Sequence, residues 1–354
     1  MDLNNFFLFF LLIVFALFFN KYFPLFILKY KPKILIDNEF KKPQAFHRDA
    51  VSTSGGISIF FSFLILCIYF LLSKNILYYE YLSFCTLFFA LGILDDLKFN
   101  IRPKFKLILM ITFLIALVIS NEFYIKNTGI DFLNRFMEID ILALFFICLC
   151  FLFIINGSNL IDGYNGLLSI HALIILTNLF FVNFFYENYN LAFFILSIIL
   201  IITLFLKYNF PKATIFLGDS GSYFLGSFIA VSVIITSVEN PQVSPFYFCI
   251  LLFYLFFEVF FSFIRKILIE RKSPLFPDSK HLHMILYKML LKKNKSRFKS
   301  NYYVSIFINL IYLVLTVPAI FMMNNGLFCK YYSLVFFIIY LFAYKIISKK
   351  IHIN

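Results

Sequence analysis

The chain has little charge and no tryptophan. Only 14% of its 354 residues are charged, whereas 62% are hydrophobic. A soluble domain needs far more polar surface than this, so the composition excludes one and predicts a polytopic integral membrane protein. Because tryptophan is absent, the aromatic belt at the membrane interfaces must be built from tyrosine. Tyrosine pairs at predicted span ends are Tyr78-Tyr79, Tyr302-Tyr303 and Tyr331-Tyr332.

Other common features are also missing. The six cysteines have no metal-type spacing in a polar loop, and we interpret them as packing residues and not as disulfides. The N-terminus lacks the basic stretch of a signal peptide, so we expect the first span to be retained. Internal repeats of the kind found in secondary transporters are not seen. We expect residues 1–354 to form a single membrane domain with no separate soluble domain.

Apolar runs long enough to cross a bilayer define the predicted fold, an all-α polytopic membrane bundle. We count eleven runs, and ten spans remain an alternative because some runs are short. They lie at about 5–28, 57–73, 79–94, 107–121, 140–157, 167–184, 191–206, 222–238, 246–264, 302–320 and 331–346.

The basic residues predict the orientation. The loops at about 29–56, 95–106, 207–221 and 265–301, together with the tail from Lys345, hold 26 of the 31 lysines and arginines. By the positive-inside rule these loops are cytoplasmic, the N-terminus is outside and the C-terminus is inside.

Polar residues follow alternate spans. Asp95-Asp96, Asp162, Asp219 and the pair His281/His283 come after the third, fifth, seventh and ninth apolar runs. Because a chain returns to the same side of the membrane after two spans, these groups fall on one face. The pattern predicts a cytoplasm-facing catalytic cleft for a highly charged substrate.

Each polar segment has its own chemistry. Adjacent carboxylates at Asp95 and Asp96 repel each other unless they share a cation or a proton. The segment from Asn156 to Gly166 interrupts apolar sequence with amides, one carboxylate and glycines, which suit a hard cation and a sugar nucleotide. Such irregular backbone is tolerated at membrane depth only where it lines a cavity.

The third and fourth segments favour phosphate. Gly218 and Gly221 let the backbone approach a phosphate closely, and Asp219, at the start of a helix, is placed as a Mg²⁺ ligand. The segment Gly218–Gly221 is similar to the nucleophile segment of trypsin-like proteases, but that fold needs a soluble β-barrel. His281 and His283 lie among cations, which favours pyrophosphate binding. Zinc is the alternative, although no further ligand lies nearby to complete a tetrahedral site.

These four segments, in this order, resemble the polyprenyl-phosphate N-acetylhexosamine-1-phosphate transferase family, which includes the phospho-MurNAc-pentapeptide transferases. The resemblance covers the chain from His47 to about His283. Asn165 stands where the family often has Asp, Glu258 stands where many members have Asp, and the histidine run stops at His283. The three-histidine run typical of the phospho-MurNAc-pentapeptide branch is absent, which favours the branch that begins O-antigen or other surface-glycan synthesis. Asn165 and Glu258 argue against an unmodified GlcNAc donor.

The resemblance implies transfer of an N-acetylhexosamine-1-phosphate, such as GlcNAc, GalNAc or a deoxy derivative, from a UDP-sugar to polyprenyl (undecaprenyl) phosphate, with release of UMP. Mg²⁺ is the expected cofactor, with Mn²⁺ as the alternative. The expected setting is the bilayer of the bacterial inner membrane, and no nucleic-acid partner is expected. The oligomeric state stays open, a homodimer included.

The candidate site residues fall into three groups. The candidate catalytic residues are Asp95, Asp96, Asp162 and Asp219, and the candidate metal ligands are Asp219, Asn159 and Asp162. The candidate substrate-binding residues are His47, Lys106, Asn156, Asn159, Asn165, Lys212, Arg265, His281 and His283.

Two other classes of protein are considered. An ion-coupled transporter would use intramembrane carboxylates such as Glu258 as a relay. The polar groups nevertheless cluster at one face and not at the midplane, and no ionisable chain crosses to the outer side. A non-enzymatic assembly partner would explain none of the polar segments.

Overall fold

The computed structural model describes residues 3–30, 34–37, 51–99, 101–125, 127–273 and 279–352. Within these ranges the chain forms thirteen α-helices, one short π-helix and one two-stranded hairpin. The α-helices are α1 (Leu3–Tyr30), α2 (Gly55–Lys74), α3 (Tyr79–Asp96), α4 (Pro103–Ser120), α5 (Asp131–Met137), α6 (Asp140–Ile161), α7 (Leu167–Phe185), α8 (Tyr189–Asn209), α9 (Gly218–Glu239), α10 (Pro245–Ile264), α11 (Leu282–Asn294), α12 (Arg297–Phe321) and α13 (Gly326–His352).

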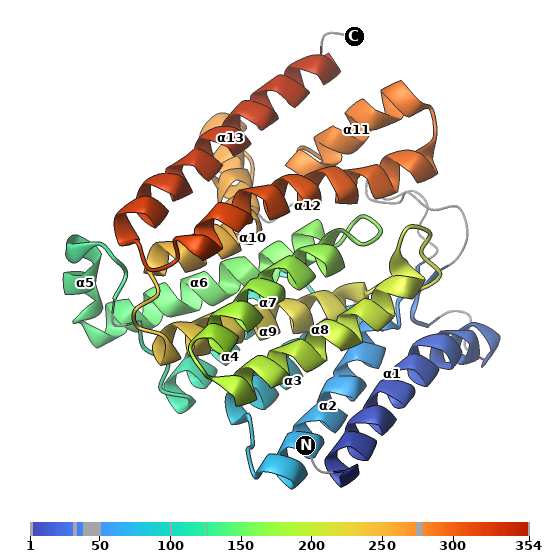
Figure 1. Cartoon of the computed structure of the whole chain (residues 1–354). Helices are drawn as coiled ribbons and strands as arrows, with labels where there is room; N and C mark the ends of the chain where they lie inside the picture. Colours follow the sequence, from blue (N-terminus) through green and yellow to red (C-terminus); the bar gives the residue numbers. More distant parts are fainter. Residues whose placement is uncertain are drawn as a thin grey trace.

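The long helices lie side by side in one bundle (Figure 1). An uninterrupted apolar sequence in a bilayer must satisfy its own backbone hydrogen bonds, and the helix does so within each segment. Ten helices of the described residues are long and apolar enough to cross a membrane. The run at 79–94 forms α3, which carries three acidic residues, Glu80, Asp95 and Asp96, and is not one of the ten. The predicted all-α membrane bundle is confirmed.

Helix α9 forms the centre of the bundle. Its spanning window is 83% buried, against 17% for α13 at the margin, and it packs on α2, α3, α6 and α7. Small residues permit this contact, because glycine and serine let the backbones of neighbouring helices approach closely. A Cβ atom on Gly56 of α2 would lie 2.2 Å from the backbone nitrogen of Gly221 in α9. The most buried helix is therefore the one that carries Asp219 in its first turn.

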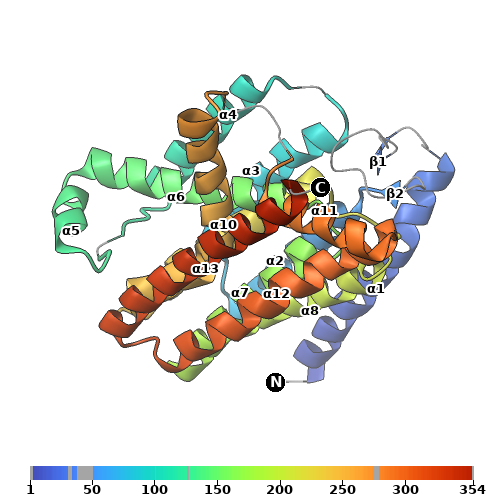
Figure 2. The same ribbon diagram turned by 90° about the horizontal axis from the view of Figure 1, so that it is seen from above.

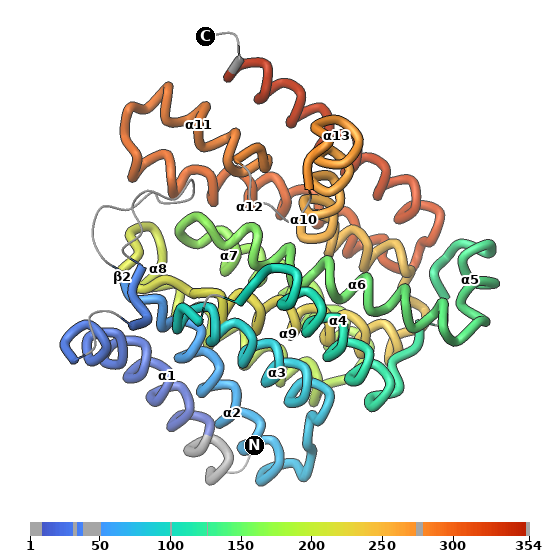
Figure 3. The backbone as a smooth tube through the Cα atoms, turned by 180° about the vertical axis from the view of Figure 1, so that it is seen from behind, coloured from blue at the N-terminus to red at the C-terminus, as the bar shows by residue number. Residues whose placement is uncertain are grey.

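A short two-stranded sheet lies at the end of the bundle where α9 begins. Strands β1 (Ile36–Asp37) and β2 (Val51–Ser52) form an antiparallel hairpin, and Ser52 also bridges to Ile215. Figure 3 shows β2 beside the end of α8. The first polar loop thus reaches the segment that precedes α9.

Two short helices, α5 and the π-helix η1 (Arg265–Ile269), lie outside the main bundle of long helices. Helix α5 lies at the margin, and η1 continues α10 where the brown ribbon turns away from its neighbours in Figure 2. The six cysteines are free thiols, of which four are buried, Cys150 is partly buried and Cys249 is exposed.

Candidate active site at one end of the bundle

The start of α9 is joined to the end of α3. The Asp96 carboxylate, at the last residue of α3, accepts hydrogen bonds from the backbone N–H groups of Asp219 and Ser220, both at 2.9 Å. The first N–H groups of a helix have no partner within the helix, and a carboxylate also interacts favourably with the positive end of the helix dipole. Asp96 therefore fixes the position of Asp219.

Two glycines make this close approach possible. A Cβ atom on Gly218, whose φ is +78°, would lie 2.7 Å from Oδ2 of Asp96. A Cβ atom on Gly92 of α3 would lie 2.4 Å from the backbone oxygen of Asp219. Any larger residue at either position would push the two carboxylate-bearing ends apart.

The side chain of Asp219 is held from a third helix. Asn159, near the end of α6, donates from Nδ2 to Oδ1 of Asp219 at 2.7 Å and to Oγ of Ser222 at 3.0 Å. The structure thus brings together Asp96 at the end of α3, Asn159 near the end of α6 and Asp219 at the start of α9. The prediction that they meet at one end of the bundle is confirmed.

Asp95 faces a different partner. Its carboxylate forms an ion pair with Nζ of Lys106 in α4, and both side chains are partly buried. The same Nζ lies 4.6 Å from the centre of the Tyr223 ring, a cation–π geometry. The neighbours Asp95 and Asp96 therefore point to different groups, one to a lysine and the other to backbone amides.

Asp162 directly follows α6 and adds a further carboxylate to this region. Burial, followed by the carboxylates of Asp219 and Asp96, raises the pKa of Asp162 well above its ordinary value. Burial and the Asp219 carboxylate raise the pKa of Asp96 to about 7. Carboxylates crowded in this way favour a positively charged partner, and Lys106 is one such partner in the cluster.

The donor set is compatible with a hard divalent cation. Carboxylate and amide oxygens of Asp219, Asn159 and Asp162 are the ligand type that Mg²⁺ prefers. Within the described ranges, no three His, Cys, Asp or Glu side chains form a group that could hold a metal ion without help. Mg²⁺ is commonly bound by one or two carboxylates together with substrate phosphates, so the residues present fit that mode.

Three other predicted substrate-binding residues lie near this cluster in sequence, Asn156 within α6 and Asn165 and Lys212 in the connections before α7 and α9. Asn156 donates to the backbone oxygen of Leu152 in its own helix, at 2.7 Å. Asn165 donates from Nδ2 to the backbone oxygen of Pro211 at 2.9 Å, so it joins two of the polar segments. Lys212 is exposed beside Pro211. His47 lies outside the described residues.

The histidine segment, His281 to His283, is buried against α10. Nδ1 of His281 lies 3.2 Å from Oε1 of Glu258, and the His281 and His283 rings are nearly parallel with centres 5.5 Å apart. The ring of Tyr164, two residues after Asp162, lies 5.7 Å from the ring of His283. Tyr164 therefore links the histidine segment to the loop that follows α6.

A salt-bridge network lies next to the histidines. Arg265 donates to Glu270 at 2.6 Å, and Lys280 donates to the same Glu270 oxygen at 2.8 Å. Glu270 lies outside the spans, and Lys280, followed by Arg265, lowers its pKa. Arg265 is therefore paired within the protein, which the sequence alone did not indicate.

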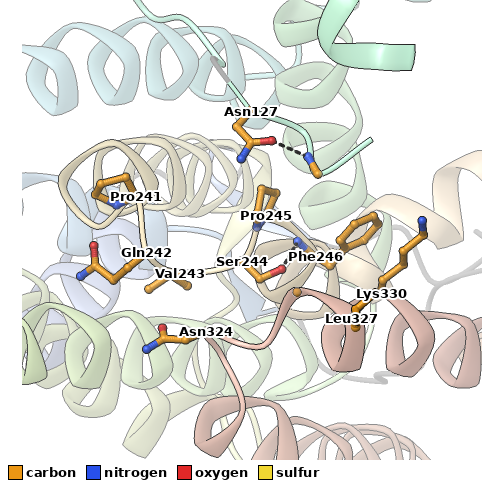
Figure 4. Close-up of a pocket in the computed structure, with 12 residues that line it drawn as sticks. Asn127, Pro241, Gln242, Val243, Ser244, Pro245, Phe246, Asn324, Leu327 and Lys330 are labelled. Atoms are coloured by element: carbon orange, nitrogen blue, oxygen red, sulfur yellow. Dashed lines mark hydrogen bonds between the residues drawn. The ribbon is translucent and has the colours of Figure 1, made fainter. Parts of the chain in front are cut away.

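The pocket drawn in Figure 4 lies elsewhere. It has a volume of about 390 Å³, and Asn127, Gln242, Ser244, Asn324 and Lys330 are among its lining residues. Four of these residues come from connections at the opposite end of the bundle and Lys330 comes from the first turns of α13, and none of the predicted site residues lines the pocket.

The chain is similar to known proteins over this region. Residues 77–237, from α3 through most of α9, match glycosyl transferase family 4. The chain is 31% identical over 246 residues to an undecaprenyl-phosphate alpha-N-acetylglucosaminyl 1-phosphate transferase of Thermotoga maritima, which covers 70% of this chain and 71% of the relative.

Two further relatives match over a shorter range. A probable undecaprenyl-phosphate N-acetylglucosaminyl 1-phosphate transferase of Bacillus subtilis is 31% identical over 55% of this chain and 54% of its own length. A phospho-N-acetylmuramoyl-pentapeptide-transferase of Clostridium beijerinckii is 30% identical over 47% of this chain and 53% of its own length. The chain therefore belongs to glycosyl transferase family 4, the polyprenyl-phosphate sugar-1-phosphate transferase family that its four polar segments resemble.

Proposed function

We propose that the chain transfers an N-acetylhexosamine-1-phosphate from a UDP-sugar to undecaprenyl phosphate and releases UMP. The names of the Thermotoga and Bacillus relatives support the lipid acceptor and the sugar-1-phosphate. The observation that carries the proposal is the position of Asp219 at the start of α9, between Asn159 and Asp96. This arrangement gathers polar groups from three helices at one end of an apolar bundle, where a lipid phosphate and a soluble nucleotide have to meet.

The proposed reaction is a displacement at phosphorus. An oxygen of the lipid phosphate attacks the β-phosphorus of the UDP-sugar and forms a new P–O bond. The bond from that phosphorus to the bridging oxygen breaks, and its electron pair leaves with UMP. The second pKa of a phosphate monoester is about 6, so the attacking oxygen is mostly ionised at neutral pH. A general base is therefore less important than positioning and charge neutralisation.

The residues have separate roles in this proposal. A Mg²⁺ ion, with Mn²⁺ as the alternative, would be held by Asp219, Asn159 and Asp162 and would neutralise charge on the donor diphosphate. Lys106 is held by Asp95 at the edge of the cluster, where its ammonium group attracts phosphate. Asp96 fixes Asp219 through the backbone. The histidine segment binds the donor diphosphate.

The finer assignment is also a proposal. The donor sugar is GlcNAc, GalNAc or a deoxy derivative, and the product begins O-antigen or another surface glycan. The site faces the cytoplasm at a bacterial inner membrane, with the N-terminus outside. Support for this orientation comes from the lysine and arginine distribution, because the site residues lie on the same loops as the basic residues.

The test uses purified full-length protein with undecaprenyl phosphate, Mg²⁺ and a panel of UDP-sugars. We expect UMP release together with a lipid-linked diphosphosugar, and neither product from the Asp219→Asn variant. UMP release without undecaprenyl phosphate would contradict the proposed acceptor. If no UDP-sugar is consumed but a cation gradient is discharged by reconstituted protein, the chain is a transporter and the proposal is wrong.

A further inference from the structure

Glu258 is a buried carboxylate inside α10. It is 1% exposed, and its two oxygens accept from groups of other elements. Oε1 accepts the backbone N–H of Leu282 at 2.8 Å, and Oε2 accepts the hydroxyl of Tyr340, in α13, at 2.7 Å. A carboxylate within a membrane helix is costly unless such partners surround it, so this position has a specific task.

The partners of Glu258 define that task. Leu282 is the first residue of α11, so Glu258 satisfies an N–H group that has no partner within that helix. His281 directs Nδ1 to the same carboxylate at 3.2 Å, and Nδ1 of His283 lies 3.9 Å from it. The hydrogen bond at one ring nitrogen of a histidine determines how the other nitrogen is presented. Glu258 therefore orients the imidazole of His281 and the start of α11. It also lies beside His283, whose Nδ1 is 3.4 Å from the hydroxyl of Tyr254.

We propose that Glu258 is the positioning residue of the histidine segment and that Tyr340 holds Glu258 in place. This inference rests on the proposed function, in which His281 and His283 bind the donor diphosphate. Tyr340 is buried in α13, beyond the 77–237 match to the family. The last helix of the chain thus acts on donor binding through α10, without touching the donor.

Tyr340→Phe tests the proposal by removing one hydroxyl. The matched control is Tyr332→Phe, which removes a hydroxyl of the same helix that donates to the backbone oxygen of Leu315 at 3.0 Å. A hydrogen bond to a charged group contributes enough for about a tenfold effect. We expect the KM for the UDP-sugar to rise by about tenfold in Tyr340→Phe, with the KM for undecaprenyl phosphate unchanged and the control equal to wild type.

Hydrogen–deuterium exchange gives a second readout that does not need activity. We expect faster exchange in the 279–290 peptide of Tyr340→Phe, and of the stronger variant Glu258→Leu, with the other helices unchanged. Normal exchange in that peptide, or faster exchange throughout the chain, would overturn the positioning role. If Glu258→Leu does not fold, Tyr340→Phe still decides the question. If wild-type protein consumes no UDP-sugar, the proposed function fails, while the exchange result reports separately whether Glu258 holds the segment.

Discussion

The backbone N–H of Asp219 donates to Oδ1 of Asp96 at 2.9 Å. This bond joins the end of α3 to the start of α9, and it gives the two aspartates of the Asp95-Asp96 pair separate partners. Asp96 acts on the backbone of α9, whereas Asp95 pairs with Lys106. Two adjacent carboxylates can therefore be tested for two different roles.

Asp219→Asn should reduce turnover by several orders of magnitude while the protein stays folded. A neutral amide removes most of the charge that a carboxylate offers to a divalent cation. UMP release at saturating Mg²⁺ measures the loss, and thermal unfolding measures the fold. Asp131→Asn, at an exposed position of α5, is the control and should behave like wild type. Normal activity in Asp219→Asn would place the cation elsewhere.

Asp96→Ala should lower both stability and activity. Loss of a cap at a helix N-terminus costs about 1 kcal/mol, and Asp219 would lose the contact that fixes its position. Asp96→Asn keeps one acceptor oxygen, so its unfolding temperature should lie between those of wild type and Asp96→Ala. Equal unfolding temperatures for all three proteins would show that the cap has no structural role.

The end of the bundle that carries the site could be predicted from the sequence. Apolar run lengths give ten or eleven crossings, and residues two spans apart return to one face. For this reason the sequence placed Asp96 and Asp219 together, and the contact at 2.9 Å confirms it. The sequence is enough for this conclusion, because the end of the bundle at which a residue lies does not depend on how its helix is rotated about its own axis.

The internal contacts of the site could not be predicted in this way. In a membrane helix the lipid-facing and the protein-facing sides are both apolar, so the pattern does not tell which side of α10 or α13 is buried. The sequence marked Glu258 as a departure from the family and as a carboxylate that a transporter could use, and it gave no sign that Tyr340 donates to it. The pairing of Arg265 with Glu270 was missed for the same reason.

Gly92→Ala should destabilise the protein, since its Cβ would lie 2.4 Å from the backbone oxygen of Asp219. Overpacking of this kind costs about 1 to 3 kcal/mol. Gly163→Ala is the matched control, because a Cβ there has no heavy atom within 4 Å. Thermal unfolding in detergent should show a lower midpoint for the first variant only. Equal midpoints would mean that α3 and α9 can separate without cost.

Substitution of His281 and His283 together by Ala should raise the KM for the UDP-sugar and lower kcat, because the segment is proposed to hold the diphosphate and not the lipid. Steady-state kinetics with each substrate varied in turn separates the two. The alternative is that His281 and His283 bind zinc and not the donor diphosphate. Stoichiometric zinc in purified protein, with activity lost on zinc chelation and not restored by Mg²⁺, would require the segment to be reinterpreted as a metal site.

The orientation of the chain predicts which loops are accessible from outside the cell. In a background with all six cysteines replaced, Ser279→Cys should not react with a membrane-impermeant maleimide added to intact cells, because the histidine segment is expected in the cytoplasm. Gln242→Cys, at an exposed position on the opposite end of the bundle, should react under the same conditions. Both thiols should react after the cells are lysed. Labelling of Ser279→Cys alone in intact cells would invert the topology and remove the site from the side on which UDP-sugars are found.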